Sequence, residues 1–508
     1  MKLLLLLSTA AFAQDWNTYS GQDNGWRYSP LKEITAVNAS NLKAAWVFQT
    51  QTAHKFEPSP IVVNGVMYLS DPPGGAVAID ARTGRPLWRF RRSVPSDYRA
   101  CCGAANRGLA ILGDNLFMGT LDAHLIAIDA KTGKLLWDTV VAPYQQGYAL
   151  TCAPLVVNGL VITGVAGGEY GIRGFLDAYD ARTGSRVWRF NTVAAPGEFG
   201  GDSWKGDSWK TGGAATWVTG SFDPSLNLIY WGTGNPGPDY NGDVREGDNL
   251  FANSLLALDA ATGKRKWHFQ FTPHDVNDWD SNHVPVLADL PWNGRPRKLV
   301  LMANRNAFYY VLDRETGEFL HGVPYAKQTW AEGLDAKGRP IRLPNSAPTR
   351  EGVIVYPGLH GGTNWFSPSY DPVARRFFVA AREEGVYFTK ANADYRPGDW
   401  FTGGGIRGIP GIQPAGAVRA LEALTGKLAW EFPLNSPPWA GLMATAGGVV
   451  FGGSSEGMFF ALDSRSGKPL WRFPTGGATF SNPISFSVDG KQHVVIASGN
   501  SLFAFALR

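Results

Sequence analysis

Cysteine is scarce in this sequence, and charge of one sign does not dominate it. The 508 residues include three cysteines, Cys101, Cys102 and Cys152, so no disulfide framework holds the fold together. No Cys-x-x-Cys-His string occurs, which excludes covalent attachment of a c-type haem to this sequence. The 47 Lys and Arg nearly balance the 43 Asp and Glu, and a net charge of +4 does not favour nucleic acid as a partner.

Long hydrophobic runs are also missing. The run Leu3–Leu7 follows Met1 and Lys2 and leads to an Ala-x-Ala end at residue 13, which predicts a secretory signal peptide over residues 1–13. This run is too short to span a bilayer, and no later stretch approaches the necessary length. A buried first strand is the alternative, but the composition changes at Gln14. We therefore expect a periplasmic or secreted protein without a membrane span.

Common catalytic signatures are absent or lack their context. The sequence contains no Walker loop, which disfavours P-loop NTPases. Strings that match Gly-x-Ser-x-Gly at 453–457 and Gly-x-Gly-x-x-Gly at 232–237 are not followed by the helical periodicity that a nucleophile elbow or a dinucleotide site needs, which disfavours hydrolases and NAD enzymes. Apolar residues make up 44% of the chain and aromatic residues 13%, which is enough for a large core.

One phrase repeats along the chain: apolar-x-Asp-Ala-x-Thr-Gly, followed by three residues and Trp. Asp-x-x-Thr-Gly has the chemistry of a tight turn, and apolar alternation on both sides predicts a β-hairpin in each repeat. The copies run from Asp80 to Trp88, Asp129 to Trp137, Asp180 to Trp188 and Asp259 to Trp267, with weaker ones from Asp313 to Leu320, Glu422 to Trp430 and Asp463 to Trp471, and Trp46 ending one more. A second phrase with Asn-Gly, at 60–66 and 154–161, adds a further hairpin to some repeats.

These repeats predict an all-β protein, an eight-bladed β-propeller with Trp-ended repeats. We expect one domain over residues 14–508, closed by pairing of residues 494–507 with a strand near the mature N-terminus. A helical solenoid or two sandwiches are the alternatives, but helical periodicity is scarce and glycine is abundant. Insertions in the longer repeats are expected to build a site.

The adjacent Cys101 and Cys102 break the repeat. Neighbouring α-carbons lie about 3.8 Å apart, whereas ordinary disulfides prefer about 4.4–6.8 Å, so a bond between them would form a strained eight-membered ring. Two reduced thiols are the alternative. We expect Cys152 to be a small buried apolar residue.

A second group of residues that do not fit the repeat supplies hard oxygen donors. Glu169 follows Gly167 and Gly168, Asn235 lies in Gly-Thr-Gly-Asn-Pro, and Asp278 and Asp280 stand two residues apart. Carboxylate and amide oxygens suit calcium-like hard cations rather than zinc or copper. Trp217, Arg305, Asn364-Trp365 and Trp439 add flat and cationic groups that suit a planar anionic ligand.

Together these strings resemble the quinoprotein alcohol dehydrogenases, the methanol/ethanol dehydrogenase family. The most specific are Cys101-Cys102 followed by Asn-Arg-Gly at 106–108, and Gly-Thr-Gly-Asn-Pro at 232–236. The resemblance implies a pyrroloquinoline quinone (PQQ) cofactor between a Cys101–Cys102 disulfide and Trp217. The cofactor-binding residues that it implies are Glu57, Cys101, Cys102, Arg107, Thr151, Gly167, Gly168, Trp217, Arg305, Asn364 and Trp439.

The resemblance also implies one metal ion, held by Glu169, Asn235, Asp278 and Asp280. Asp280 resembles the extra ligand of the lanthanide-using branch, so a lanthanide is favoured over Ca²⁺. Membrane-bound glucose dehydrogenases share Asp-x-Asp, so calcium stays open. Ala166 and Ala215 stand where the family usually has Ser and Thr, so two hydrogen bonds of about 0.5–1.5 kcal/mol each would be missing.

The implied function is oxidation of an alcohol to an aldehyde or ketone by hydride transfer to the quinone. In this hypothesis Asp278 accepts the hydroxyl proton and Arg305 stabilises developing negative charge. Electrons would pass to an external acceptor such as a soluble cytochrome c, and a homodimer stays open. The alternatives are an aldose- or glucose-type quinoprotein dehydrogenase and a non-enzymatic scaffold of the outer-membrane assembly type.

Overall fold

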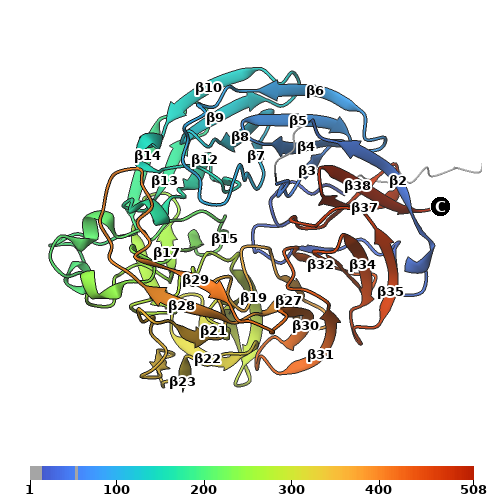
Figure 1. Ribbon diagram of the computed structural model, residues 1–508. Helices are drawn as coiled ribbons and strands as arrows, with labels where there is room; N and C mark the ends of the chain where they lie inside the picture. Colours follow the sequence, from blue (N-terminus) through green and yellow to red (C-terminus); the bar gives the residue numbers. More distant parts are fainter. Residues whose placement is uncertain (1–13, 52–54) are drawn as a thin grey trace, which may run out of the picture.

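The computed structural model describes residues 14–51 and 55–508, so the predicted signal peptide lies outside the described residues. The regular secondary structure of the described chain is almost entirely β-strand, arranged as a wheel of sheets around a centre (Figure 1). None of its helices is long and apolar enough to cross a bilayer.

Five sheets are each built from four strands that follow one another along the chain. Their strands are β3 (Ile61–Val63), β4 (Val66–Asp71), β5 (Gly75–Asp80), β6 (Pro86–Arg91); β7 (Ala110–Leu112), β8 (Asn115–Gly119), β9 (His124–Asp129), β10 (Leu135–Val140); β11 (Leu155–Val157), β12 (Leu160–Gly164), β13 (Phe175–Asp180), β14 (Arg186–Asn191); β15 (Ser221–Asp223), β16 (Leu228–Gly232), β17 (Ser254–Asp259), β18 (Arg265–Gln270); and β19 (Val286–Trp292), β20 (Arg295–Ala303), β21 (Phe308–Asp313), β22 (Phe319–Pro324).

Three further sheets join strands that are not all consecutive, in the orders β26-β27-β30-β31, β1-β32-β33-β34-β35 and β2-β38-β37-β36. Their bounds are β26 (Ser369–Asp371), β27 (Arg376–Glu383), β30 (Ala415–Glu422), β31 (Leu428–Leu434); β1 (Tyr28–Ser29), β32 (Leu442–Thr445), β33 (Val449–Gly453), β34 (Met458–Asp463), β35 (Pro469–Pro474); and β2 (Leu42–Gln49), β36 (Ile484–Val488), β37 (Lys491–Ser498), β38 (Ser501–Leu507).

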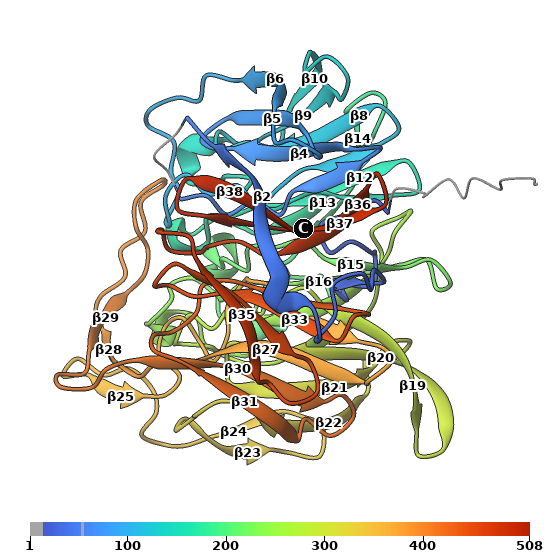
Figure 2. The same ribbon diagram turned by 90° about the vertical axis from the view of Figure 1, so that its right-hand side faces the viewer.

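Insertions supply two small sheets and six short 3₁₀ turns. The small sheets are β23 (Ala331–Leu334) with β24 (Pro340–Arg342), and β25 (Val353–Val355) with β28 (Val386–Lys390) and β29 (Gly404–Gly408). The turns are η1 (Ala39–Asn41), η2 (Tyr144–Gln146), η3 (Gly168–Tyr170), η4 (Gly201–Ser203), η5 (Ser208–Thr211) and η6 (Gly242–Val244). In the side view, β28 and β29 lie along one edge of the molecule (Figure 2).

The repeated phrase forms the predicted hairpins. In the β5–β6 hairpin, the Asp80 carboxylate accepts hydrogen bonds from the backbone N–H of Arg82 and Thr83, and Gly84 adopts a φ of +73°. The Asn-Gly hairpins are confirmed too. Asn64 and Gly65, between β3 and β4, both have positive φ, as a type I′ turn requires.

The Trp residues that end the repeats join neighbouring sheets. The indole N–H of Trp46 donates to the carbonyl of Ala81, and that of Trp88 to Ala130. The bond recurs from Trp137, Trp188, Trp267 and Trp430 to Ala181, Ala260, Arg314 and Ser464. Each ring covers the turn glycine of the next repeat: a methyl group on Gly133 would lie 2.7 Å from Cε3 of Trp88.

The repeat ending in Leu320 uses a different residue for this bond. The Tyr309 hydroxyl on β21 donates to the carbonyl of Ala423, and Tyr309 also lies against Gly426. The last link, from the Trp471 indole N–H to the carbonyl of Leu42, joins the end of the chain to its beginning. β2 pairs with β38, which confirms the predicted closure (Figure 1).

Candidate active site

A cavity of about 350 Å³ gathers the predicted site residues from across the chain. This volume lies within the range of about 300–1,000 Å³ that is usual for small-ligand sites. All the residues predicted to hold a cofactor or a metal line this cavity, from Glu57 to Trp439. Ala166 and Ala215 line it as well.

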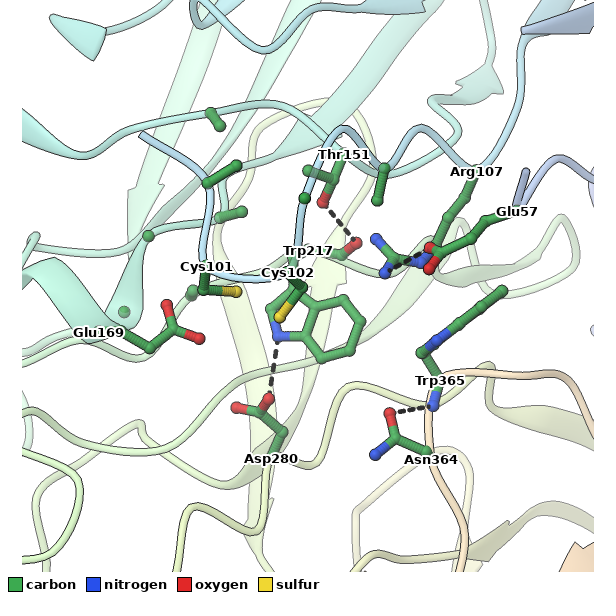
Figure 3. A pocket seen from close by; sticks show the side chains of 18 of the residues that line it. Glu57, Cys101, Cys102, Arg107, Thr151, Glu169, Trp217, Asp280, Asn364 and Trp365 are labelled. Atoms are coloured by element: carbon green, nitrogen blue, oxygen red, sulfur yellow. Dashed lines mark hydrogen bonds and ion pairs between the residues drawn. The ribbon is translucent and has the colours of Figure 1, made fainter. Parts of the chain in front are cut away.

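Glu169, Asn235, Asp278 and Asp280 form an oxygen-donor corner of the cavity. The Asp280 carboxylate accepts from the Asn235 backbone N–H at 2.7 Å and from the Trp217 indole N–H at 3.1 Å. Figure 3 shows Glu169 and Asp280 both pointing toward the space beside Trp217 and the two cysteines. The four predicted donors therefore meet, although they come from three separate loops.

The loop that carries Asp278 and Asp280 is held from within by Asp275. Its buried carboxylate accepts the backbone N–H of Asn277 at 3.0 Å and of Trp279 at 2.7 Å. The Trp279 indole is fully buried and donates to the carbonyl of Gly358. These bonds form a tight turn in which Asp278 adopts a φ of +57°, a conformation that Asp tolerates better than most residues.

Asp239 is a buried acidic residue at this corner that the sequence analysis missed. Its carboxylate accepts from the Asn235 side-chain Nδ2 at 2.8 Å, so the amide oxygen Oδ1 is the free end of that side chain. A Cβ on Gly168 would lie 3.7 Å from this Oδ1. The only available signal was its position four residues after Asn235.

The corner carries excess negative charge. Burial raises the pKa of Glu169, Asp239 and Asp278, and the neighbouring carboxylates raise it further. The Arg305 guanidinium lies beside this corner, with nitrogens 3.2 Å from Asp280 Oδ2 and 3.7 Å from Asp278 Oδ1. A bound cation would favour the ionised form of all these groups.

The oxygen donors fit the predicted hard cation by residue type but do not form a complete coordination site. Within residues 14–51 and 55–508, no group of three His, Cys, Asp or Glu side chains is arranged as a complete metal site. The donors present are carboxylates and one amide oxygen, which fit a hard cation. The residue types therefore fit, while the geometry lacks a preassembled ligand cage.

Flat groups form the wall beside the corner. The Arg107 guanidinium lies over the rings of both Trp217 and Trp365, at 4.7 and 4.6 Å from their centroids. Arg107 also pairs with the buried Glu57 carboxylate at 2.9 Å. Asn364 accepts from Arg305 at 3.2 Å and from the Trp365 backbone N–H (Figure 3).

The predicted Cys101–Cys102 disulfide is not present in the structure. Both residues are free thiols that line the cavity, Cys102 being the more exposed. The structure therefore does not show the bonded pair, which stays a prediction. Cys152 is fully buried, as predicted.

An inserted loop packs on the turn that carries Glu169. The backbone N–H of Phe401 donates to the Glu169 carbonyl at 2.7 Å, and the rings of Trp400 and Tyr170 have centroids 5.2 Å apart. This loop joins β28 to β29, so the insertion helps to position a predicted ligand. Other cavity residues missed from the sequence include Lys55, Leu359, His360 and Phe480.

A wheel of four-stranded sheets with one lined cavity of this kind defines a β-propeller with a ligand site. A family model described as glucose/ethanol/alcohol dehydrogenase, beta-propeller domain, matches residues 16–327, which is more than half of the chain. A second model, described as outer membrane protein assembly factor BamB, matches residues 414–508.

Curated relatives match along nearly the whole chain. The quinoprotein alcohol dehydrogenase PedH of Pseudomonas putida is 38% identical over 506 residues, covering 94% of this chain and 84% of the relative. The lanthanide-dependent methanol dehydrogenase of Methylacidiphilum fumariolicum is 36% identical over 508 residues, and the match covers 93% of this chain and 82% of the relative.

Solved structures of alcohol dehydrogenases also match the fold of nearly the whole chain. The quinohemoprotein alcohol dehydrogenase from Comamonas testosteroni superposes with a TM-score of 0.94 at 33% identity, covering 97% of this chain and 80% of that one. A europium-containing methanol dehydrogenase superposes with a TM-score of 0.93 at 32% identity, and the match covers 97% of this chain and 98% of that one. This chain belongs to the quinoprotein alcohol dehydrogenase family.

Proposed function

We propose that this protein oxidises an alcohol to an aldehyde or ketone, with PQQ in the described cavity and one metal ion at its oxygen-donor corner. One observation carries the proposal: Trp217, Arg107 and the four oxygen donors, which include Asp278, line the same cavity. The relatives named above are alcohol dehydrogenases, which supports an alcohol over a sugar and an enzyme over an assembly scaffold.

Different cavity residues would bind the cofactor, accept the proton and stabilise charge. PQQ, when bound, supplies the two-electron acceptor for the hydride of the alcohol. Trp217 offers a flat face, while Arg107, Thr151, Arg305 and Asn364 offer polar partners for its carboxylates and carbonyls. Asp278 is the base for the hydroxyl proton, and the Arg305 guanidinium stabilises negative charge beside it.

Glu169, Asn235, Asp278 and Asp280 would hold the metal, with Trp217 and the Asn235 N–H orienting Asp280. The metal is a Lewis acid in this proposal. Three carboxylates favour a trivalent lanthanide over Ca²⁺, and two of the similar proteins are described as lanthanide-dependent or europium-containing. A disulfide between Cys101 and Cys102, formed on oxidation, would complete the second face of the cofactor site.

The remaining assignments follow from the same proposal. The eight sheets of four or five strands are the eight blades of a single propeller domain over residues 14–508. Residues 1–13 direct export to the periplasm, where a soluble cytochrome c or a similar carrier takes the electrons. The proposal also includes a homodimer as the oligomeric state.

Replacing Asp278 tests the function most directly. Asp278→Asn keeps the shape of the side chain but removes the base, so we expect turnover to fall by at least about 10²-fold while PQQ stays bound. Dye-linked alcohol oxidation measures the first effect and the absorbance spectrum of bound quinone the second. Asp243→Asn, an exposed residue paired with Lys390, is the control and should keep full activity. Normal turnover by Asp278→Asn, or no quinone binding by the unmodified protein with metal present, contradicts the proposal.

A further inference from the structure

The cavity contains a histidine whose role the proposed function does not explain. His360 lines the cavity beside Leu359, and its ring packs edge-on against Trp439 with centroids 4.9 Å apart. Asn364, whose Oδ1 accepts from Arg305, donates through Nδ2 to the His360 carbonyl at 3.0 Å. The imidazole is therefore fixed next to residues of the proposed cofactor site.

Glu384 determines which way the imidazole presents its nitrogens. Its Oε2 lies 3.1 Å from His360 Nδ1 and accepts from the Arg382 guanidinium at 2.8 Å. Burial alone would raise the pKa of Glu384, but the hydrogen bonds and charges of His360 and Arg382 outweigh it and lower the pKa to about 2. An ionised carboxylate can only accept, so Nδ1 carries the proton, and Nε2 of the neutral ring is an acceptor.

The surroundings of the ring favour its neutral form. Burial lowers the pKa of His360 below 6.5, and the charges of Arg382 and Arg305 act in the same direction, while Glu384 opposes them. These three are the charged groups that face the ring. Among the described residues, Nε2 has no hydrogen-bond partner, and the side chain is 34% exposed. The ring thus connects the cavity with solvent.

We propose that His360, oriented by Glu384, is a second proton acceptor of the cavity, which takes up a proton released by alcohol oxidation and passes it to solvent. This inference rests on the proposed function. Converting an alcohol into a carbonyl compound breaks one O–H and one C–H bond, forms the C=O double bond, and releases two electrons and two protons overall. The electrons leave through the cofactor to the external acceptor. Asp278 can hold one proton, and a second group is needed for the other.

Paired variants separate this role from a structural one. Removing the ring in His360→Ala should lower kcat by about 10²-fold with KM nearly unchanged, and added imidazole should restore part of the loss. Glu384→Gln keeps the ring but removes the negative charge, so the pKa of His360 falls. Activity is lost as the pH drops through this pKa, so the acidic limb of the profile should move to lower pH. Glu383→Gln is the control, because Glu383 pairs with Arg419 instead.

Proton NMR of the PQQ- and lanthanum-loaded protein provides a readout independent of turnover. One imidazole resonance, absent from His360→Ala, should titrate below pH 6.5 and shift to a lower midpoint in Glu384→Gln but not in Glu383→Gln. Turnover by His360→Ala equal to that of Glu383→Gln, or a titration that Glu384→Gln leaves unchanged, overturns the inference. If the unmodified protein binds no quinone, the proposed function itself fails. Bound quinone with full activity of His360→Ala contradicts the proton role alone.

Discussion

Single residues at the oxygen-donor corner are fixed by contacts that leave little freedom. Both oxygens of Asp280 accept hydrogen bonds, one from Asn235 N–H and one from the Trp217 indole. Gly234 allows this approach, because a Cβ there would lie 2.5 Å from Asp280 Oδ1. The indole that forms the flat wall thus also orients a proposed ligand, which couples the two halves of the site.

Asp280→Ala should distinguish the two candidate metals. The change removes one negative charge, and a trivalent ion loses more attraction than a divalent one. We expect lanthanide affinity to fall at least about tenfold more than calcium affinity, a difference of roughly 1.4 kcal/mol. Calorimetric titration with lanthanum and with calcium measures both. Equal losses would remove the preference for a lanthanide.

Asp239→Ala should weaken the metal site without removing a ligand. The variant frees the Asn235 amide, which Asp239 holds at 2.8 Å, to rotate its oxygen away. Losses of about 10–100-fold in metal affinity are usual when the partner of a ligand is removed. Terbium luminescence titration measures the change, with Asp243→Asn as the neighbouring control. Unchanged affinity would show that Asn235 is oriented by other contacts.

At the scale of the elements, the repeat is a hairpin whose glycine receives the Trp of the preceding repeat. The contact explains why Gly follows Thr in the phrase: positive φ and the overlying ring both exclude a side chain. The same alignment recurs around the wheel, with Tyr309 substituting where Leu320 ends the strand.

Two glycine variants separate ring contact from backbone strain. Gly133→Ala places a methyl group 2.7 Å from Trp88 Cε3 at a φ of +73°. Gly159→Ala has a similar φ of +79° but no atom within 4 Å. Backbone strain should cost about 1 kcal/mol in both, and overpacking about 1–3 kcal/mol more in Gly133→Ala. Urea unfolding measures the difference; equal destabilisation would mean that Trp88 moves aside at no cost.

At the scale of the whole molecule, the two ends of the chain close the wheel. One core cluster contains Trp46, Val62, Phe451 and Phe505, so strands near both ends share a single hydrophobic core. β38 pairs with β2 on one side and β37 on the other. Closure removes the free sheet edges that an open array would present.

Deleting residues 501–508 should therefore cost far more than a local contact. The deletion removes β38 and separates β2 from its sheet, so we expect loss of the cooperative unfolding transition and a tendency to aggregate. The control is a circular permutant opened between Asn158 and Gly159, with residues 508 and 14 joined by a flexible linker, which keeps β38. Thermal unfolding followed by circular dichroism compares the two. A truncated chain that unfolds as sharply as the permutant would contradict the closure argument.

Local chemistry made the hairpins and most of the site predictable. The turns depend on residues within five positions of one another, and the predicted donors were unusual strings that the repeat could not explain. Asp239 and the His360–Glu384 pair could not be predicted, because their roles depend on residues that contact them only in the folded chain. His360 and Glu384 are 24 positions apart, and an isolated His or Asp in a loop carries no sequence signal.

What the sequence by itself determined is the unit: a hairpin with Asp, Thr and Gly at its turn and an aromatic residue at its end. The tertiary structure alone decided which carbonyl each indole reaches, that Tyr309 replaces a missing Trp, and that three separate loops meet at one corner. The physical reason is range: turn preferences act over a few bonds, whereas packing, burial and charge join residues that only the closed wheel brings together.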